Sequence, residues 1–306
     1  MGISHYLKEI GRGARGAKAL DRAQAADLFG QILDGGVTDL EIGAFCIAMR
    51  IKGETLEEMS GFLDATHARV APFPASEQPI IVLPSYNGAR RLPVLTPLLA
   101  LLLAREGLPV LLHGMRTEAR RVLASDVLAA LGMAPATAVG QIAPGDVVHI
   151  ETTTLHPGLA RLLRARETIG LRNPAHSVVK LMNPCGANAL VISSYTHPEY
   201  FDTLSATYTA LGMNGVLSRG LEGEAAADPR RAPRYDGFVH GRHILLQDQR
   251  AGTTHDVPGL PIEIDVSTTA TYTQKVLDGD LPIPVAIAEQ VQHIVQTARS
   301  VQQEAA

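Results

Sequence analysis

Three segments of this chain carry side chains suited to binding an anion. The segment Pro84-Ser-Tyr-Asn-Gly-Ala-Arg-Arg91 directly follows the apolar run Ile80–Leu83. His113-Gly-Met-Arg116 and Arg219-Gly-Leu-Glu222 follow two later apolar runs. Because ligands of parallel sheets bind beyond the carboxyl ends of the strands, we expect the three segments to surround one crevice. Arginine would supply positive charge there, since its planar guanidinium matches the oxygens of phosphate.

The first segment differs from an ordinary phosphate-binding loop. Such loops wrap phosphate with backbone N–H groups and use several glycines, because a side chain at a close-approach or positive-φ position collides with the ligand. Between Ser85 and Arg91 this chain has Gly88 alone. The pattern leaves two interpretations open, a lost enzyme site or a site for a changed ligand.

Composition is typical of an ordinary globular protein. The 306 residues are 46% hydrophobic and 19% charged. No apolar run reaches the roughly 18 residues needed to cross a bilayer, and the first residues lack the apolar core of a signal peptide. These features predict a cytoplasmic protein with no membrane partner. Cys46 and Cys185 lie far apart among small or apolar residues, which predicts buried thiols and no metal site.

Positive charge is concentrated near the N-terminus. The chain has a net charge of -4, yet residues 1–22 have a local charge of +3. Such asymmetry favours an anionic partner, because neutralisation of phosphates by Lys and Arg drives nucleic-acid binding through counterion release. A solvated basic face is the alternative interpretation. The cations of this segment are Lys8, Arg12, Arg15, Lys18 and Arg22.

The N-terminal part carries helix signals. Asp21 is placed to cap a helix of regularly spaced apolar residues. Thr38-Asp-Leu-Glu41 and Thr55-Leu-Glu-Glu58 each form a capping box, in which the Thr side chain accepts the third amide of the helix and Glu reaches back to the cap. We therefore expect helices over 39–51 and 56–68.

Beyond a proline-rich linker at 71–79, short apolar runs alternate with amphipathic segments. This alternation predicts a mostly parallel central sheet covered by helices. The fold class expected is α/β, with a small N-terminal helical bundle domain at 1–75 and a larger α/β domain at 76–306. The expected strands are Ile80–Leu83, Val110–His113, Val147–Glu151, Ala189–Ser193 and Gly215–Ser218. The expected helices lie near 95–105, 119–131, 158–166 and 198–211, with a closing helix after Pro284.

Several phrases resemble the anthranilate phosphoribosyltransferase scaffold of the glycosyltransferase family 3, or nucleoside phosphorylase-like, superfamily. They are Ala48–Glu58, His113-Gly114, Ala129–Met133, Leu155-His-Pro157, Ile169-Gly-Leu-Arg172 and Asn183-Pro184. Four others resemble the divergent YbiB-like branch more closely: Lys8–Gly13, Pro84–Arg90, Leu95–Leu99 and His197–Tyr200. That branch is regarded as nucleic-acid binding and as lacking the parent activity. The resemblance also implies that a helical segment near 168–184 joins the N-terminal domain.

The chain departs from the enzymes' pattern at three places. Ser85-Tyr-Asn-Gly-Ala89 stands where the enzymes have Gly-Thr-Gly-Gly-Asp, and Leu112-His-Gly-Met115 where they have Lys-His-Gly-Asn. Gly223-Glu-Ala-Ala-Ala-Asp228 lacks the adjacent Asp-Glu pair that holds magnesium. Each departure removes electrostatic support for a departing diphosphate, so the three argue against the parent chemistry. We expect Glu222 and Glu224 to be solvated loop acids, and His156 to be a turn or cap element.

We assign no catalytic residue and no metal ligand. The resemblance implies a degenerate donor or ligand pocket, in which Arg90 and Arg116 are the best candidates for phosphate contact and Tyr86 offers a surface for base stacking. Its residues are Ser85, Tyr86, Asn87, Gly88, Arg90, Arg91, His113, Gly114, Arg116 and Arg172. Surface pairing with Glu118, Asp126 or Glu167 is the alternative interpretation of the arginines.

The resemblance implies a homodimer paired through the helical domain, and the leading hypothesis is that this dimer binds nucleic acid with little sequence preference. DNA, single-stranded above all, and RNA both stay open as ligands. No cofactor is expected. The residues expected to line the groove are Lys8, Arg12, Arg15, Lys18, Arg22, Lys52 and Lys180.

The alternative hypothesis is an anthranilate phosphoribosyltransferase-like pentosyltransferase that uses a phosphorylated ribose donor. Only this alternative would require Mg²⁺. The segment 84–91 discriminates between the two hypotheses, because it corresponds to the donor's diphosphate cradle.

Overall fold

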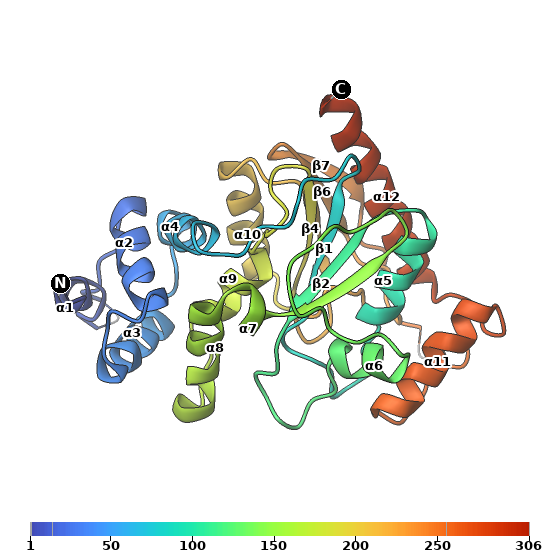
Figure 1. Cartoon of the computed structure of the whole chain (residues 1–306), viewed down its shortest axis with the longest axis horizontal. Helices are drawn as coiled ribbons and strands as arrows, with labels where there is room; N and C mark the ends of the chain where they lie inside the picture. The colour runs from blue at the N-terminus through green and yellow to red at the C-terminus, as the bar shows by residue number, and fades with distance from the viewer. Residues whose placement is uncertain (1, 14, 255, 306) are drawn as a thin grey trace. The chain divides into compact units, whose positions relative to one another are not determined.

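The computed structural model describes residues 2–13, 15–254 and 256–305, which form two compact units (Figure 1). A helical unit comprises Met1–Pro72 with Thr152–Pro184, and an α/β unit comprises Phe73–Glu151 with Cys185–Ala306. The helical unit thus contains residues 152–167, which the sequence analysis had left in the α/β part. The reason is the amphipathic helix α8, Pro157–Ile169, which buries Leu159, Leu162 and Leu163 and packs on α2.

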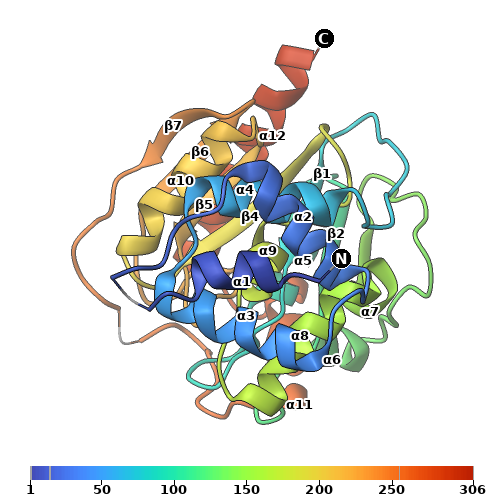
Figure 2. The ribbon, with the colours of Figure 1, turned by 90° about the vertical axis from the view of Figure 1, so that its left-hand side faces the viewer.

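The helical unit is built from capped amphipathic helices. Asp21, Thr38 and Thr55 each accept the third amide of the following helix, so the predicted capping boxes at Thr38 and Thr55 are confirmed. In Figure 2 helices α1 and α3 face the viewer side by side, and the two are in contact. The helices are α1 Ser4–Ile10, α2 Arg22–Leu33, α3 Asp39–Lys52, α4 Leu56–His67, α7 Thr152–Leu155, α8, and α9 Ala175–Leu181.

The α/β unit contains one sheet with the strand order β3-β2-β1-β4-β5-β6-β7. The pairs from β3 to β5 are parallel, and β6 and β7 add an antiparallel edge, which confirms the predicted mostly parallel sheet. The strands are β1 Ile80–Pro84, β2 Val110–Gly114, β3 Val147–Glu151, β4 Ala189–Tyr195, β5 Gly215–Arg219, β6 Tyr235–Val239 and β7 Arg242–Gln247.

In the described part of the α/β unit, five helices accompany the sheet. In Figure 1, α5, α6, α11 and α12 lie on one side of it and α10 on the other. Among the described residues, no helix is both long and apolar enough to cross a membrane. The helices are α5 Thr96–Arg105, α6 Ala124–Ala130, α10 Glu199–Ala210, α11 Val266–Asp278 and α12 Val285–Ala305. The helix predicted at 119–131 is shorter in the structure, where α6 begins at Ala124.

The chain order of the strands determines where a ligand site can lie. β1 is fully buried and sits between β2 and β4, where the order along the sheet reverses. In open parallel sheets such a switch point leaves a crevice beyond the carboxyl ends of the strands. The segments that follow β1 and β5 reach this edge.

Both cysteines are buried free thiols, as predicted. Burial raises the pKa of Cys46 to about 11 and that of Cys185 to about 12. Each thiol therefore stays protonated near neutral pH and behaves as a small apolar side chain.

A buried ion pair connects three parts of the helical unit. The Glu58 carboxylate is fully buried and accepts hydrogen bonds from Leu20 N, Thr55 N and Lys52 Nζ. The Lys52 side chain is only 8% exposed. This placement corrects the sequence-based assignment of Lys52 to a nucleic-acid groove, because its ammonium group neutralises an internal carboxylate.

We predict that Glu58→Ala lowers the free energy of unfolding by about 3 kcal/mol or more, because it leaves the Lys52 charge and the Leu20 amide without their partner. Urea denaturation followed by circular dichroism measures the change. Glu57→Ala, at an exposed position in the same helical turn, is the matched control and should change stability by less than about 0.5 kcal/mol. Equal effects of the two substitutions would contradict the structural role of the pair.

Candidate functional site

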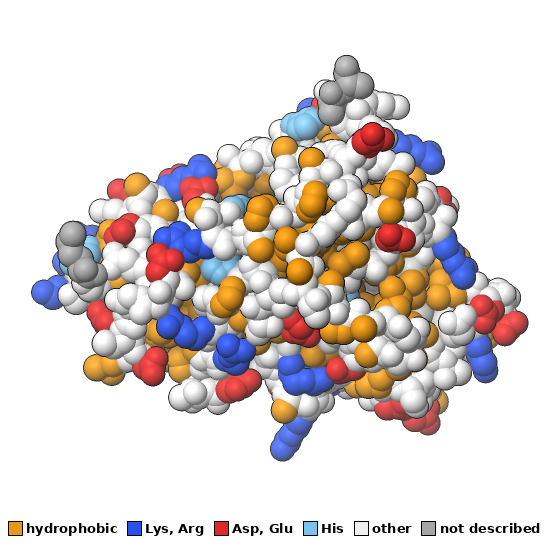
Figure 3. Space-filling view, in the orientation of Figure 1, with side chains coloured by type: hydrophobic (Ala, Val, Ile, Leu, Met, Phe, Trp, Pro, Cys, Tyr) orange, Lys and Arg blue, Asp and Glu red, His pale blue; other side chains and the backbone are white. Residues whose placement is uncertain are grey.

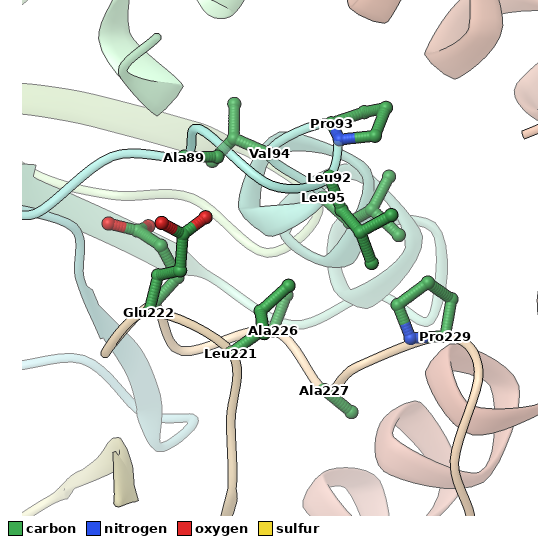
Figure 4. A pocket seen from close by; sticks show the side chains of 11 residues that line it. Ala89, Leu92, Pro93, Val94, Leu95, Leu221, Glu222, Ala226, Ala227 and Pro229 are labelled. Carbon is green, nitrogen blue, oxygen red and sulfur yellow. The ribbon is translucent and has the colours of Figure 1, made fainter. Parts of the chain in front are cut away.

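Two of the three segments predicted to surround one crevice, those after β1 and β5, meet in the α/β unit, whereas the pocket lining includes no residue of His113–Arg116. They line a small pocket, to which the residues just before α5 also contribute (Figure 4). In Figure 4 the Glu222 side chain points toward the chain that carries Ala89. The central feature of this site is a pair of carboxylates, Glu222 and Glu224, inserted against the loop after β1.

Glu224 is surrounded by hydrogen-bond donors. Its Oε2 accepts from Ser85 Oγ at 2.6 Å and from Thr96 Oγ1 at 2.9 Å. Its Oε1 accepts from Gly88 N at 2.7 Å and from Asn87 N at 3.2 Å. The residue is 4% exposed. The expectation of a solvated loop acid is therefore wrong for Glu224.

Glu222 continues the same arrangement further along the loop. Its Oε2 accepts from Arg90 N at 2.9 Å and from Arg91 N at 3.0 Å. Its Oε1 lies 3.4 Å from both Arg90 Nε and Arg121 Nη1. The side chain is 7% exposed. The expectation of a solvated acid is wrong here too, since the carboxylate is held by backbone amides and two guanidinium groups.

Two glycines permit this close approach of the loops. Gly88 has φ +67°, and a Cβ there would lie 2.7 Å from Val122 O. A Cβ on Gly114 would lie 1.7 Å from Ser85 O. The His113-Gly114 pair retained from the family's pattern therefore has a packing role at its glycine, because no side chain fits between β2 and the loop.

The side chains predicted to line the pocket are mostly buried. Tyr86 is 2% exposed, and Ser85, Asn87 and His113 are buried as well. Thr117 Oγ1 donates to the Tyr86 carbonyl oxygen at 3.0 Å. The Tyr86 ring is therefore not presented to solvent, which corrects its assignment as a base-stacking surface.

The pocket arginines divide into two groups. Arg90 and Arg91 are exposed, as required for contact with a phosphate. Arg116 donates to Asp126 Oδ2 at 2.6 Å and to Arg121 O at 2.8 Å, so it is engaged within the loop. Arg172 belongs to the helical unit and is half-buried. Of the two best sequence candidates, Arg90 has the more accessible guanidinium.

The carboxylate oxygens at this site are not available as ligands for magnesium. Mg²⁺ requires nearly octahedral oxygen ligands and keeps several waters. Both oxygens of Glu224 already accept N–H or O–H donors, and Glu222 faces two guanidinium groups. Within the described parts of the chain, no cluster of three or more His, Cys, Asp or Glu is placed to hold a metal ion.

His156 is a helix cap, as the sequence analysis expected. Its Nδ1 accepts from Leu159 N at 3.2 Å at the start of α8. Burial, the largest cause, lowers its pKa to about 4. The ring is therefore neutral near pH 7, which leaves the capping nitrogen able to accept.

The cations near the N-terminus lie on the surface of the helical unit. Lys8, Arg12, Arg15, Lys18 and Arg22 are all exposed. Arg12 and Lys18 share Glu9, at 2.6 and 3.6 Å, and Arg22 makes a two-pronged contact with Asp64. Lys8 and Arg15 pair with no carboxylate among the described residues. Lys180, on α9, is half-buried.

The sequence-based assignment omitted the two buried carboxylates of the site and the arginines of the predicted helix near 158–166. Glu222 and Glu224 were discounted because they do not form an adjacent acidic pair; their two-residue spacing after a strand was the available signal. Helix α8 carries Arg161, whose Nη2 donates to Ile32 O at 2.6 Å, and the exposed Arg164. On the face seen in Figure 3, Lys and Arg side chains of the helical elements are interspersed with Asp and Glu.

Comparison with known proteins agrees with this architecture. Residues 4–69 match the family described as glycosyl transferase family, helical bundle domain. YbiB of Escherichia coli (strain K12) is 38% identical over 302 residues, which cover 95% of this chain and 92% of YbiB. An anthranilate phosphoribosyltransferase of Anaeromyxobacter sp. (strain Fw109-5) is 31% identical over 198 residues, 63% of this chain and 58% of that protein.

A solved structure shares the whole fold. The anthranilate phosphoribosyltransferase of Thermus thermophilus superposes with a TM-score of 0.71, covering 96% of this chain and 94% of that one, at 19% sequence identity. The helical bundle, the mostly parallel sheet and the near full-length similarity to YbiB converge on one family. The chain belongs to the glycosyltransferase family 3, anthranilate phosphoribosyltransferase-like superfamily, as a homologue of YbiB.

Proposed function

We propose that this protein is a cytoplasmic homodimer that binds nucleic acid, single-stranded DNA above all, with little sequence preference. The observation that carries the proposal is the exposed cationic segment 8–22 of the helical unit. Lys8 and Arg15 make no ion pair among the described residues, so their charge is not neutralised internally. Phosphate contact by such cations releases condensed counterions and supplies affinity that does not depend on base sequence.

The state of the α/β unit supports the same proposal. A phosphoribosyl donor would need its diphosphate in the loop after β1, where Glu222 and Glu224 already accept the hydrogen bonds. The nearby acids do not fit magnesium. The geometry therefore disfavours the alternative, a phosphoribosyltransferase, although relatives of the chain carry that name.

An apolar stripe on α3 supports pairing of two copies through the helical unit. Leu40, Ala44, Ile47 and Ile51 are exposed at helical spacing, and Leu40 is 85% and Ile51 60% exposed. A Cβ on Gly43 would meet nothing within 4 Å, so the adjacent surface is open to close approach. A two-fold axis places the same stripe on both partners, which buries it and doubles every phosphate contact.

We predict that Lys8→Ala with Arg15→Ala weakens binding to single-stranded DNA and flattens its salt dependence. The slope of log K against log salt should fall by about 0.7 for each lost phosphate contact. Fluorescence anisotropy with a labelled oligonucleotide at several salt concentrations measures this slope. Lys275→Ala with Arg299→Ala removes equal charge from exposed positions of the α/β unit and is the control. Loss of the same size in both variants, or no binding by the unmodified protein at low salt, refutes the proposal.

We predict that Ile47→Asp with Ile51→Asp converts a dimer into a monomer, because the introduced charges would be buried against their own copies across the two-fold axis. Light scattering coupled to size-exclusion chromatography measures the mass. Ile262→Asp, at a position 91% exposed in the α/β unit, is the control and should leave the mass unchanged. A dimer that persists in the α3 variant places the interface elsewhere.

We predict no turnover of anthranilate with phosphoribosyl pyrophosphate and magnesium, because the donor loop is occupied. Anthranilate fluorescence follows the reaction, with a catalytically active anthranilate phosphoribosyltransferase as the positive control. Turnover that rises with donor concentration would establish the transferase function instead.

A further inference from the structure

The loop after β1 has the character of an oxyanion site that already contains an anion. Six donors from residues 85–96 converge on the two carboxylates: the hydroxyls of Ser85 and Thr96 and the amides of Asn87, Gly88, Arg90 and Arg91. Backbone amides from nearly consecutive residues form the type of concavity that binds phosphate. We propose that the segment after β5 is an internal ligand whose Glu222 and Glu224 close this loop to phosphate groups, and that removal of the Glu224 carboxylate opens it to pyrophosphate.

The Glu224 carboxylate is stabilised by neutral groups. Among the described residues, no Lys, Arg or His forms an ion pair with this buried carboxylate. The four donors that contact it are neutral hydroxyls and amides. Pre-oriented neutral dipoles in a water-poor site are what stabilises a bound oxyanion. The loop therefore supplies the full stabilisation of one negative charge, and any oxyanion of suitable size can use it.

The segment after β5 that carries the two carboxylates has a strained backbone. Glu222 has φ +58° and Gly223 has φ +84°, so two consecutive residues are left-handed. This conformation is unfavourable for a residue with a side chain and persists only where surrounding contacts enforce it. Asn87 Nδ2 donates to the Glu222 carbonyl oxygen and provides such a contact. The strained turn places carboxylates on both sides of Gly223 against the loop.

Competition follows from these contacts. A phosphate group entering the loop would have to take the amide and hydroxyl donors from Glu224 and leave that carboxylate buried without partners. Leaving a buried charge unpaired is strongly unfavourable. The Glu224 carboxylate therefore excludes phosphorylated ligands by occupying the donors of the loop, while the donors themselves remain in place.

The test is calorimetric titration of the full chain with sodium pyrophosphate in metal-free buffer. The unmodified protein and the control Glu263→Ala, which removes an exposed acid of the same unit, should show no binding. Glu224→Ala should bind pyrophosphate saturably, with an affinity on the order of tenfold or more above the weakest that the titration of the unmodified protein would detect, because the vacated amides and hydroxyls become charge-assisted donors. Its thermal midpoint should rise with pyrophosphate but not with chloride at equal ionic strength.

Three results would overturn the inference. One is binding of pyrophosphate by the unmodified protein as tightly as by Glu224→Ala. Another is a folded Glu224→Ala protein that neither binds nor gains stability. Should Glu224→Ala fail to fold, Glu224→Gln replaces it, because glutamine keeps the side-chain volume and one acceptor while removing the charge. Absence of pyrophosphate binding by a folded Glu224→Gln protein is the third result. Binding of single-stranded DNA by the same variants should be unchanged, so this test is independent of the proposed function.

Discussion

The buried carboxylate of Glu224 is the constraint on which the α/β unit's ligand edge depends. An ionised group at 4% exposure is tolerated only where donors replace its lost water. Ser85, Gly88 and Thr96 supply them from the end of β1 and the start of α5. One carboxylate therefore determines the conformation of the loop and the path of the segment after β5. The requirement for a glycine at position 88, beside Val122 O, follows from the same packing.

The two units differ in where their charged and hydrogen-bonding groups find partners. In the α/β unit the amide and hydroxyl donors of the loop after β1 are satisfied internally, and Arg121 is buried between Glu118, at 2.7 Å, and Gly88 O, at 3.1 Å. In the helical unit the charge that matters for stability is internal, in the Lys52–Glu58 pair, while Lys8 and Arg15 stay at the surface. The surface of the helical unit therefore carries two cations whose charge no described carboxylate neutralises.

Local signals in the sequence predicted much of the fold, whereas long-range pairing decided what was missed. The capping boxes at Thr38 and Thr55 act within four residues, so they were readable directly. Helix α11 was missed because its threonines have low helix propensity and its helical form depends on packing against α6. The burial of Lys52 and Glu224 could not be predicted either, because a charged residue is normally expected at the surface. Lys52 is buried by its pairing with Glu58, and Glu224 by the donors of the loop after β1.

The cations that could contact phosphate differ in whether a carboxylate lies beside them. Arg90 is exposed, but its Nε lies 3.4 Å from Glu222, and its own amide donates to that carboxylate. A phosphate approaching Arg90 is therefore repelled by the acid that organises the loop, and the repulsion is strong where both anions are poorly hydrated. The carboxylate that closes the loop after β1 therefore partly neutralises Arg90, whereas the charges of Lys8 and Arg15 have no carboxylate partner among the described residues.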